Sequence, residues 1–142
     1  MHIVSKNVRE WTVPAEQGQE GVEDVQVADD ESTVGWLVDK YDSCCVSYAI
    51  PTELVVWRNG AVIQRFDHLV QAVFGWTFLR SGAELAYHQA PLHGDEIYDC
   101  THVDVRTGKV LEEWWIGKTK TPPAWVELLN QAYPMPEPND SR

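Results

Sequence analysis

The sequence contains one strand-and-turn pattern twice, about fifty residues apart, and this repetition constrains the fold more than any other feature. In residues 27–36 an apolar residue precedes six mostly polar residues and then an apolar, a small and an aromatic residue; residues 78–87 repeat this order. Farther along, Asn59–Gly60 and Thr107–Gly108 each separate two β-rich runs. Such dipeptides are typical of tight hairpins whose glycine takes positive φ. The repetition predicts two diverged units of four antiparallel strands.

Each unit is expected to form a meander, in which consecutive strands are neighbours in the sheet. The predicted strands are residues 22–27, 33–40, 52–58 and 61–66 in the first unit, and residues 73–79, 84–89, 97–106 and 109–116 in the second. Apolar and polar side chains alternate along 97–105, as in a half-buried strand. We therefore predict a single all-β domain over residues 1–133, with units at about 20–67 and 70–118 packed together.

Two segments have helical spacing instead. After two prolines, apolar residues recur at intervals of three and four at Trp125, Leu128, Leu129 and Ala132. This spacing predicts a short amphipathic helix over about residues 124–132. A similar spacing in residues 66–73 favours a helical turn between the units. The proline-rich tail, residues 134–142, is expected to be disordered.

Acidic residues dominate the charge of the chain. There are 22 acidic and 11 basic residues, a net charge of −11, and the stretch from Glu16 to Glu31 holds seven acids and no lysine or arginine. Such a field repels nucleic acid and anionic membranes and speeds encounter with a basic protein. The alternative is that the acidity only keeps a small domain soluble. The expected partner is a basic protein, not nucleic acid or membrane.

The order of strands, Asp-rich turn, loop and Gly turn resembles a blade of a β-propeller of the TolB or WD40-like kind. More narrowly, the chain is similar to an uncharacterised bacterial β-repeat family in residues 33–38, 44–51, 54–60, 93–94 and 104–108. The resemblance implies two blade-like units. Because two blades cannot close a ring, their sheets should pack on each other or on a second copy. The family supplies no activity, and its members are usually exported.

The sequence allows two alternatives for the cellular compartment of the protein. Residues 1–11 carry Lys6, Arg9 and Glu10 without an apolar run, so they are not a signal peptide. The protein is thus expected in the cytoplasm, or in the periplasm or outside the cell after a leader has been removed. In an oxidising compartment Cys44 or Cys45 could bridge Cys100. The longest nearly apolar stretch, residues 72–79, is too short to cross a bilayer.

The stretch from Tyr87 to His102 holds three histidines, three acids and a cysteine, which are the usual metal ligands. On a strand, Cys100 and His102 share a face, and His88 could approach from the neighbouring strand. No ligand spacing is specific, so metal binding is kept only as an alternative, and no metal or cofactor is expected. Cys44 or Cys45 as a nucleophile with a histidine is disfavoured, because nearby acids raise a thiol pKa. No catalytic residue is predicted, and the chain is not expected to be an enzyme.

These observations favour a non-catalytic protein-binding domain, in its concrete form an immunity or inhibitor protein that blocks a bacterial toxin or secreted enzyme. The alternative is a structural β module that self-associates, for example as a homodimer. Trp115 is either an exposed anchor or covered by the predicted helix. The residues predicted to contact the partner are Asp29, Asp30, Glu31, Tyr48, His93, Asp95, Glu96 and Trp115.

Overall fold

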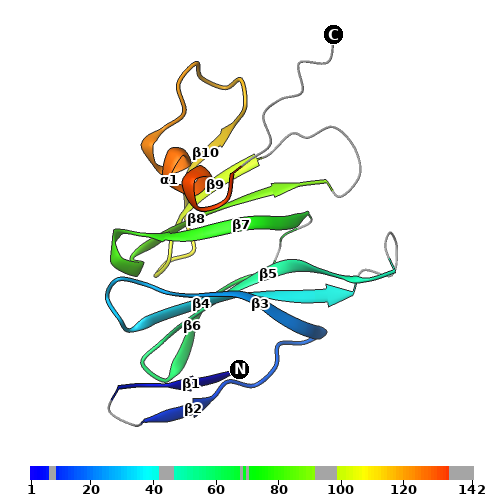
Figure 1. Cartoon of the computed structure of the whole chain (residues 1–142), viewed down its shortest axis with the longest axis vertical. Helices are drawn as coiled ribbons and strands as arrows, with labels where there is room; N and C mark the ends of the chain where they lie inside the picture. Colours follow the sequence, from blue (N-terminus) through cyan, green and yellow to red (C-terminus); the bar gives the residue numbers. More distant parts are fainter. Residues whose placement is uncertain (7–8, 42–46, 68, 70, 92–98, 135–142) are drawn as a thin grey trace.

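The computed structural model describes residues 1–6, 9–41, 47–67, 69, 71–91 and 99–134. Within them the chain forms three antiparallel sheets, one of two strands and two of four, and a short C-terminal helix (Figure 1). The prediction of an all-β fold with one short helix is therefore confirmed. In the part that the structure describes, no helix has the length and apolar character needed to cross a bilayer.

The two repeated units form the two four-stranded sheets. The first contains β3 (Gln19–Val27), β4 (Thr33–Tyr41), β5 (Ala49–Arg58) and β6 (Ala61–Phe66). The second contains β7 (Ala72–Leu79), β8 (Glu84–Ala90), β9 (Asp99–Asp104) and β10 (Val110–Trp115). Both are meanders with neighbours in chain order, which confirms the prediction from the repeat. A 3₁₀ turn, Arg80–Gly82, joins β7 to β8.

The two glycine turns differ in length. Arg58 pairs directly with Ala61, so Asn59 and Gly60 alone make the first turn, with φ of 50° and 92°. That geometry matches the predicted tight hairpin. Thr107 and Gly108 lie in a wider loop, in which the Asp104 N–H donates to the Lys109 carbonyl at 2.9 Å. The Asp104 carboxylate accepts from the Thr107 N–H at 2.8 Å, and this Asx-type contact stabilises the wider loop.

The two sheets pack face to face and share the main core. Leu37, Leu54 and Val56 of the first sheet lie in one cluster with Trp76 and Leu85 of the second. The close approach depends on the small residue at position 35, since a Cβ there would lie 2.5 Å from the Trp76 ring. The repeated units are thus held together by an apolar interface between their sheets.

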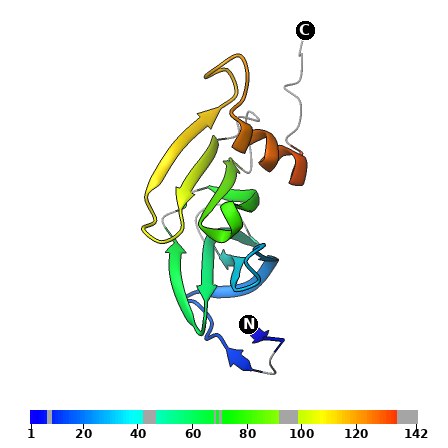
Figure 2. The same ribbon diagram turned by 90° about the vertical axis from the view of Figure 1, so that its left-hand side faces the viewer.

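The outer face of each sheet has its own cover (Figures 1 and 2). A hairpin of β1 (His2–Val4) and β2 (Glu10–Thr12) covers the first sheet, and Trp11 meets Trp57 edge-on at 4.9 Å. Helix α1 (Ala124–Ala132) covers the second sheet, where its apolar side chains join Trp114 in a separate cluster. The helix was predicted from the sequence, whereas the hairpin was not.

Two further predictions concern the link between the units and the C-terminal tail. No helix includes residues 67, 69 or 71, and residues 68 and 70 of the expected helical turn lie outside the described part. Residues 135–142 of the tail also lie outside it.

Candidate functional site

The first candidate site is a polar cluster beneath α1. The register places His88 opposite Cys100 and Ala86 opposite His102, so both histidines and the cysteine share the face that α1 covers, as the sequence predicted. His102 lies 2.6 Å from the Glu84 carboxylate, and its ring packs on Trp125 at 5.3 Å. The side chains most suggestive of chemistry are therefore gathered in one place.

Burial lowers the chemical reactivity of the side chains in this cluster. It lowers the pKa of His88 to about 4, and it raises the pKa of the Cys100 thiol to about 12, with the charge of Asp99 adding to the rise. Both groups are neutral near pH 7, and a neutral thiol is a poor nucleophile. Among the described residues, no group of three or more histidine, cysteine or acidic side chains is arranged to hold a metal ion.

The Cys100 thiol is expected to resist modification in the folded protein. In a Cys44→Ser, Cys45→Ser background, dithionitrobenzoate should react with Cys100 only after denaturation, because the thiol is buried and its pKa is high. A matched variant carrying Thr121→Cys, at an exposed position, should react at once when folded. Equal reaction rates for the two thiols would contradict the burial.

The second candidate site is a groove of about 830 Å³ between β1 and the first sheet, with both apolar and polar lining residues. Three of the valines that line it are exposed: Val4 of β1 and Val25 and Val27 of β3 are 57%, 50% and 62% exposed. Because water solvates apolar side chains poorly, a concave surface that gathers several of them is typical of a binding site. We name this surface, with its lining residues Met1–Lys6, the hairpin groove.

The hairpin groove exists because a two-stranded hairpin covers only part of a four-stranded sheet. Trp36 of β4 and Trp57 of β5 are buried beneath the hairpin. Val27 of β3 pairs with Val34 of β4, so the two side chains lie on the same face of the sheet. Val34 is buried there, whereas Val27 is exposed. Among the described strands, β1 pairs only with β2 and β3 only with β4, so each keeps one edge without a neighbouring strand.

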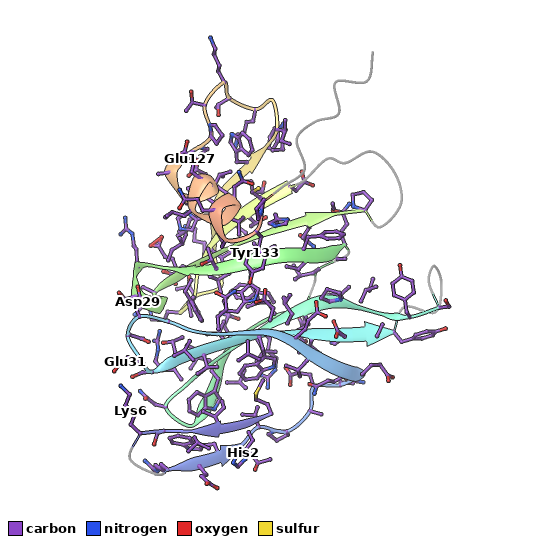
Figure 3. The ribbon with its side chains drawn as sticks, viewed as in Figure 1. His2, Lys6, Asp29, Glu31, Glu127 and Tyr133 are labelled. Carbon is purple, nitrogen blue, oxygen red and sulfur yellow. The ribbon has the colours of Figure 1, made fainter. Side chains whose placement is uncertain are left out.

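Opposite charges meet at one end of the hairpin groove. Lys6 lies 3.2 Å from Glu31, and both side chains are mostly exposed, so this ion pair contributes little stability. Figure 3 shows Lys6, Glu31 and Asp29 along the same side of the molecule. The Arg9 guanidinium lies over Trp11 at 5.5 Å from the ring centre and forms no ion pair within the described part of the chain.

No protein-family model, curated protein or solved structure matches this chain. No residue role is therefore inherited from a relative, and the resemblance of the units to propeller blades stays a prediction.

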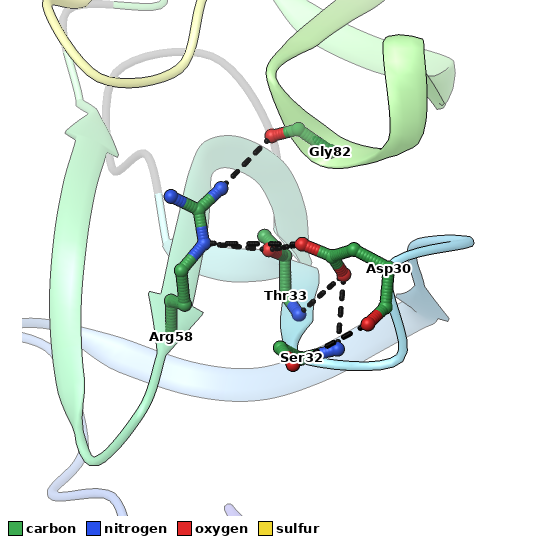
Figure 4. A network of polar contacts seen from close by, with 5 residues as sticks. All are labelled: Asp30, Ser32, Thr33, Arg58 and Gly82. Carbon is green, nitrogen blue, oxygen red and sulfur yellow. Dashed lines mark hydrogen bonds and ion pairs between the residues drawn. The ribbon is translucent and has the colours of Figure 1, made fainter.

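The predicted contact residue Asp30 has an internal role (Figure 4). Its carboxylate accepts hydrogen bonds from the N–H groups of Ser32 and Thr33, each at 2.9 Å, and from the Thr33 hydroxyl at 2.6 Å. Arg58 donates to the Thr33 hydroxyl and to the Gly82 carbonyl of the second unit. Partial burial alone would raise the pKa of Asp30, but these hydrogen bonds lower it. Asp30 thus stabilises its turn and, through Thr33 and Arg58, the junction of the units.

The other predicted contact residues lie in separate places. Asp29 and Glu31 are exposed on the β3–β4 turn, and Glu31 lines the hairpin groove beside Lys6. Tyr48 is exposed just before β5. Trp115 is exposed at the end of β10 beneath the Lys118 ammonium, while its neighbour Trp114 is the one covered by α1.

The remaining predicted contact residues, His93, Asp95 and Glu96, lie outside the described part, as do Cys44 and Cys45. The hairpin groove was not predicted from the sequence. Its one local signal was the alternation of Val25 and Val27 with polar neighbours along β3.

Proposed function

We propose that the chain is a non-catalytic protein-binding domain that holds its partner in the hairpin groove. The observation that carries this proposal is the gathering of exposed Val4, Val25 and Val27 in one concave surface. Apolar side chains of a partner would gain burial there, at roughly 25 cal/mol for each Å² removed from water. The neutral thiol and imidazole beneath α1 support a binding role over a catalytic one.

In its finer form, the proposal is an immunity or inhibitor protein that occupies a basic toxin or secreted enzyme. The net charge of −11 supports a basic partner, because opposite net charges speed encounter. Asp29 and Glu31 would act as rim charges beside the hairpin groove, where charges affect association more than dissociation. A cytoplasmic location belongs to the same proposal.

Replacing Val27 with aspartate is expected to reduce partner capture strongly. A carboxylate in the groove would be desolvated by any apolar partner, which should weaken binding about tenfold or more. The measurement is quantitative mass spectrometry of proteins captured from extracts of the encoding organism. The matched control is Val110→Asp, since Val110 is a similarly exposed strand valine on β10. Proteins captured equally by all three chains would contradict the proposal.

Self-association is a second candidate, and exposed Leu111 and Trp115 on edge strand β10 favour it. A second copy would pair along this edge. Sedimentation velocity separates the two functions: a dimer lost on Leu111→Asp but kept on Val27→Asp supports self-association through β10.

A further inference from the structure

We infer that the hairpin groove receives an extended segment of the partner, which adds as a third strand to the free edge of β1 beneath β3. This inference rests on the proposed function and names the chemistry of what is bound. The segment carries apolar side chains at every second position and a carboxylate side chain near Arg9. Three properties of the groove lead to it.

The first property is an incomplete layer. The hairpin has two strands, while the sheet above it has four, and the uncovered part lies beneath edge strand β3. All of residues Met1–Lys6 line the groove, whereas β2 contributes only Trp11 to the lining, so the edge of β1 borders the uncovered part. The β1 edge away from β2 has no neighbouring strand among the described ones. Its backbone N–H and C=O groups can therefore pair with an added strand.

The second property is spacing. A strand added to β1 would lie about 4.8 Å from it and about 10 Å below the sheet, the ordinary distances between paired strands and between packed sheets. Its side chains would point alternately toward and away from β3. Val25 and Val27 are themselves two residues apart, and both are exposed. Alternate apolar side chains of the segment can thus cover both valines, and polar ones between them face solvent.

The third property is charge at one end. The groove lining holds the cations Lys6 and Arg9 and the single carboxylate of Glu31. Lys6 lies against Glu31, while Arg9 has no ion pair in the described part of the chain and lies over the Trp11 ring. A carboxylate of the bound segment would complement Arg9, and Arg binds carboxylates through paired N–H donors. The acidic surface as a whole acts at long range, so a basic protein can carry such a segment.

The test selects a displayed library of random peptides, about ten residues long as in a long strand, on the immobilised chain. Enriched peptides are expected to alternate apolar and polar residues and to carry aspartate or glutamate at a fixed offset. Their affinity should fall about tenfold or more on Val27→Asp and stay unchanged on Val110→Asp. On Arg9→Gln the preference for the acidic residue should disappear while the apolar alternation remains.

Amide hydrogen exchange with an enriched peptide bound distinguishes strand addition from loose apolar contact. Amides of β1 that face its free edge should exchange more slowly, whereas those of β10 should not change. Peptides without alternation, or β1 amides that exchange equally fast with and without peptide, would overturn the inference. If whole proteins are still captured in a Val27-dependent way, the proposed function survives and only strand addition fails. If capture is independent of Val27, both fail.

Discussion

Replacing Trp76 with alanine is expected to lower the free energy of unfolding by about 4 kcal/mol. The indole is fully buried between the two sheets, where it packs edge-on against Phe78 at 4.9 Å. Its N–H donates to the Asp24 carbonyl at 3.1 Å, so the change also removes a hydrogen bond between the units. Gly35 opposite leaves no side chain to fill the cavity.

Urea unfolding followed by circular dichroism measures this loss. The matched control is Trp115→Ala, because Trp115 is 44% exposed and lies at the end of β10. Its loss should cost about 1 kcal/mol or less. Similar losses for the two variants would show that the sheets do not depend on the Trp76 contact.

Replacing Asp30 with alanine is expected to lower the free energy of unfolding by about 2 kcal/mol at neutral pH. Three hydrogen bonds to the carboxylate disappear, and two backbone N–H groups in the β3–β4 turn lose their acceptor. Asp29→Ala is the control, since the neighbouring Asp29 is exposed and its loss should stay within about 0.5 kcal/mol.

The contribution of Asp30 should also depend on pH in a defined direction. Its folded-state pKa lies below the ordinary value of 3.8, so the stabilisation is present above about pH 4 and is lost as the pH falls through the folded-state value. The difference in urea midpoint between the native chain and Asp30→Ala should therefore shrink on acidification below pH 4. A difference that stays constant to lower pH would mean that the turn is stabilised by something other than the ionised carboxylate.

The strand order of both units could be predicted because its signals are local. Alternation along residues 97–105 and the Asn59–Gly60 turn are set by neighbouring residues, and the same holds for the 3.6-residue spacing of α1. The β1–β2 hairpin could not be predicted, since strands of three residues carry too little pattern. The hairpin groove could not be predicted either, because its position depends on which part of the first sheet the hairpin covers.

Asp30 shows that one residue can carry sequence signals for two roles. An aspartate followed closely by Ser32 and Thr33 is typical of an Asx turn, yet the density of charge around it favours a surface role. For the pair Trp114 and Trp115, the sequence leaves open which of the two side chains points outward. Alternation on a strand requires that one of them point outward, but only the position of α1 decides that Trp115 does.

The two ends of the sheet stack are closed by unlike elements, and this bears on how such a chain can change in evolution. The hairpin packs on the first unit and the helix on the second, while the interface between the units joins one sheet face to another. Tyr133, just after the helix, also donates a hydrogen bond to Asp24 and accepts one from Gln26 of the first unit. Duplication of a unit in the middle would keep the hairpin on its sheet, as in solenoid proteins whose capping repeats differ from the inner ones, but it would separate Tyr133 from Asp24 and Gln26. Variation by whole repeats would therefore require the inserted unit to supply new partners for the Tyr133 hydroxyl.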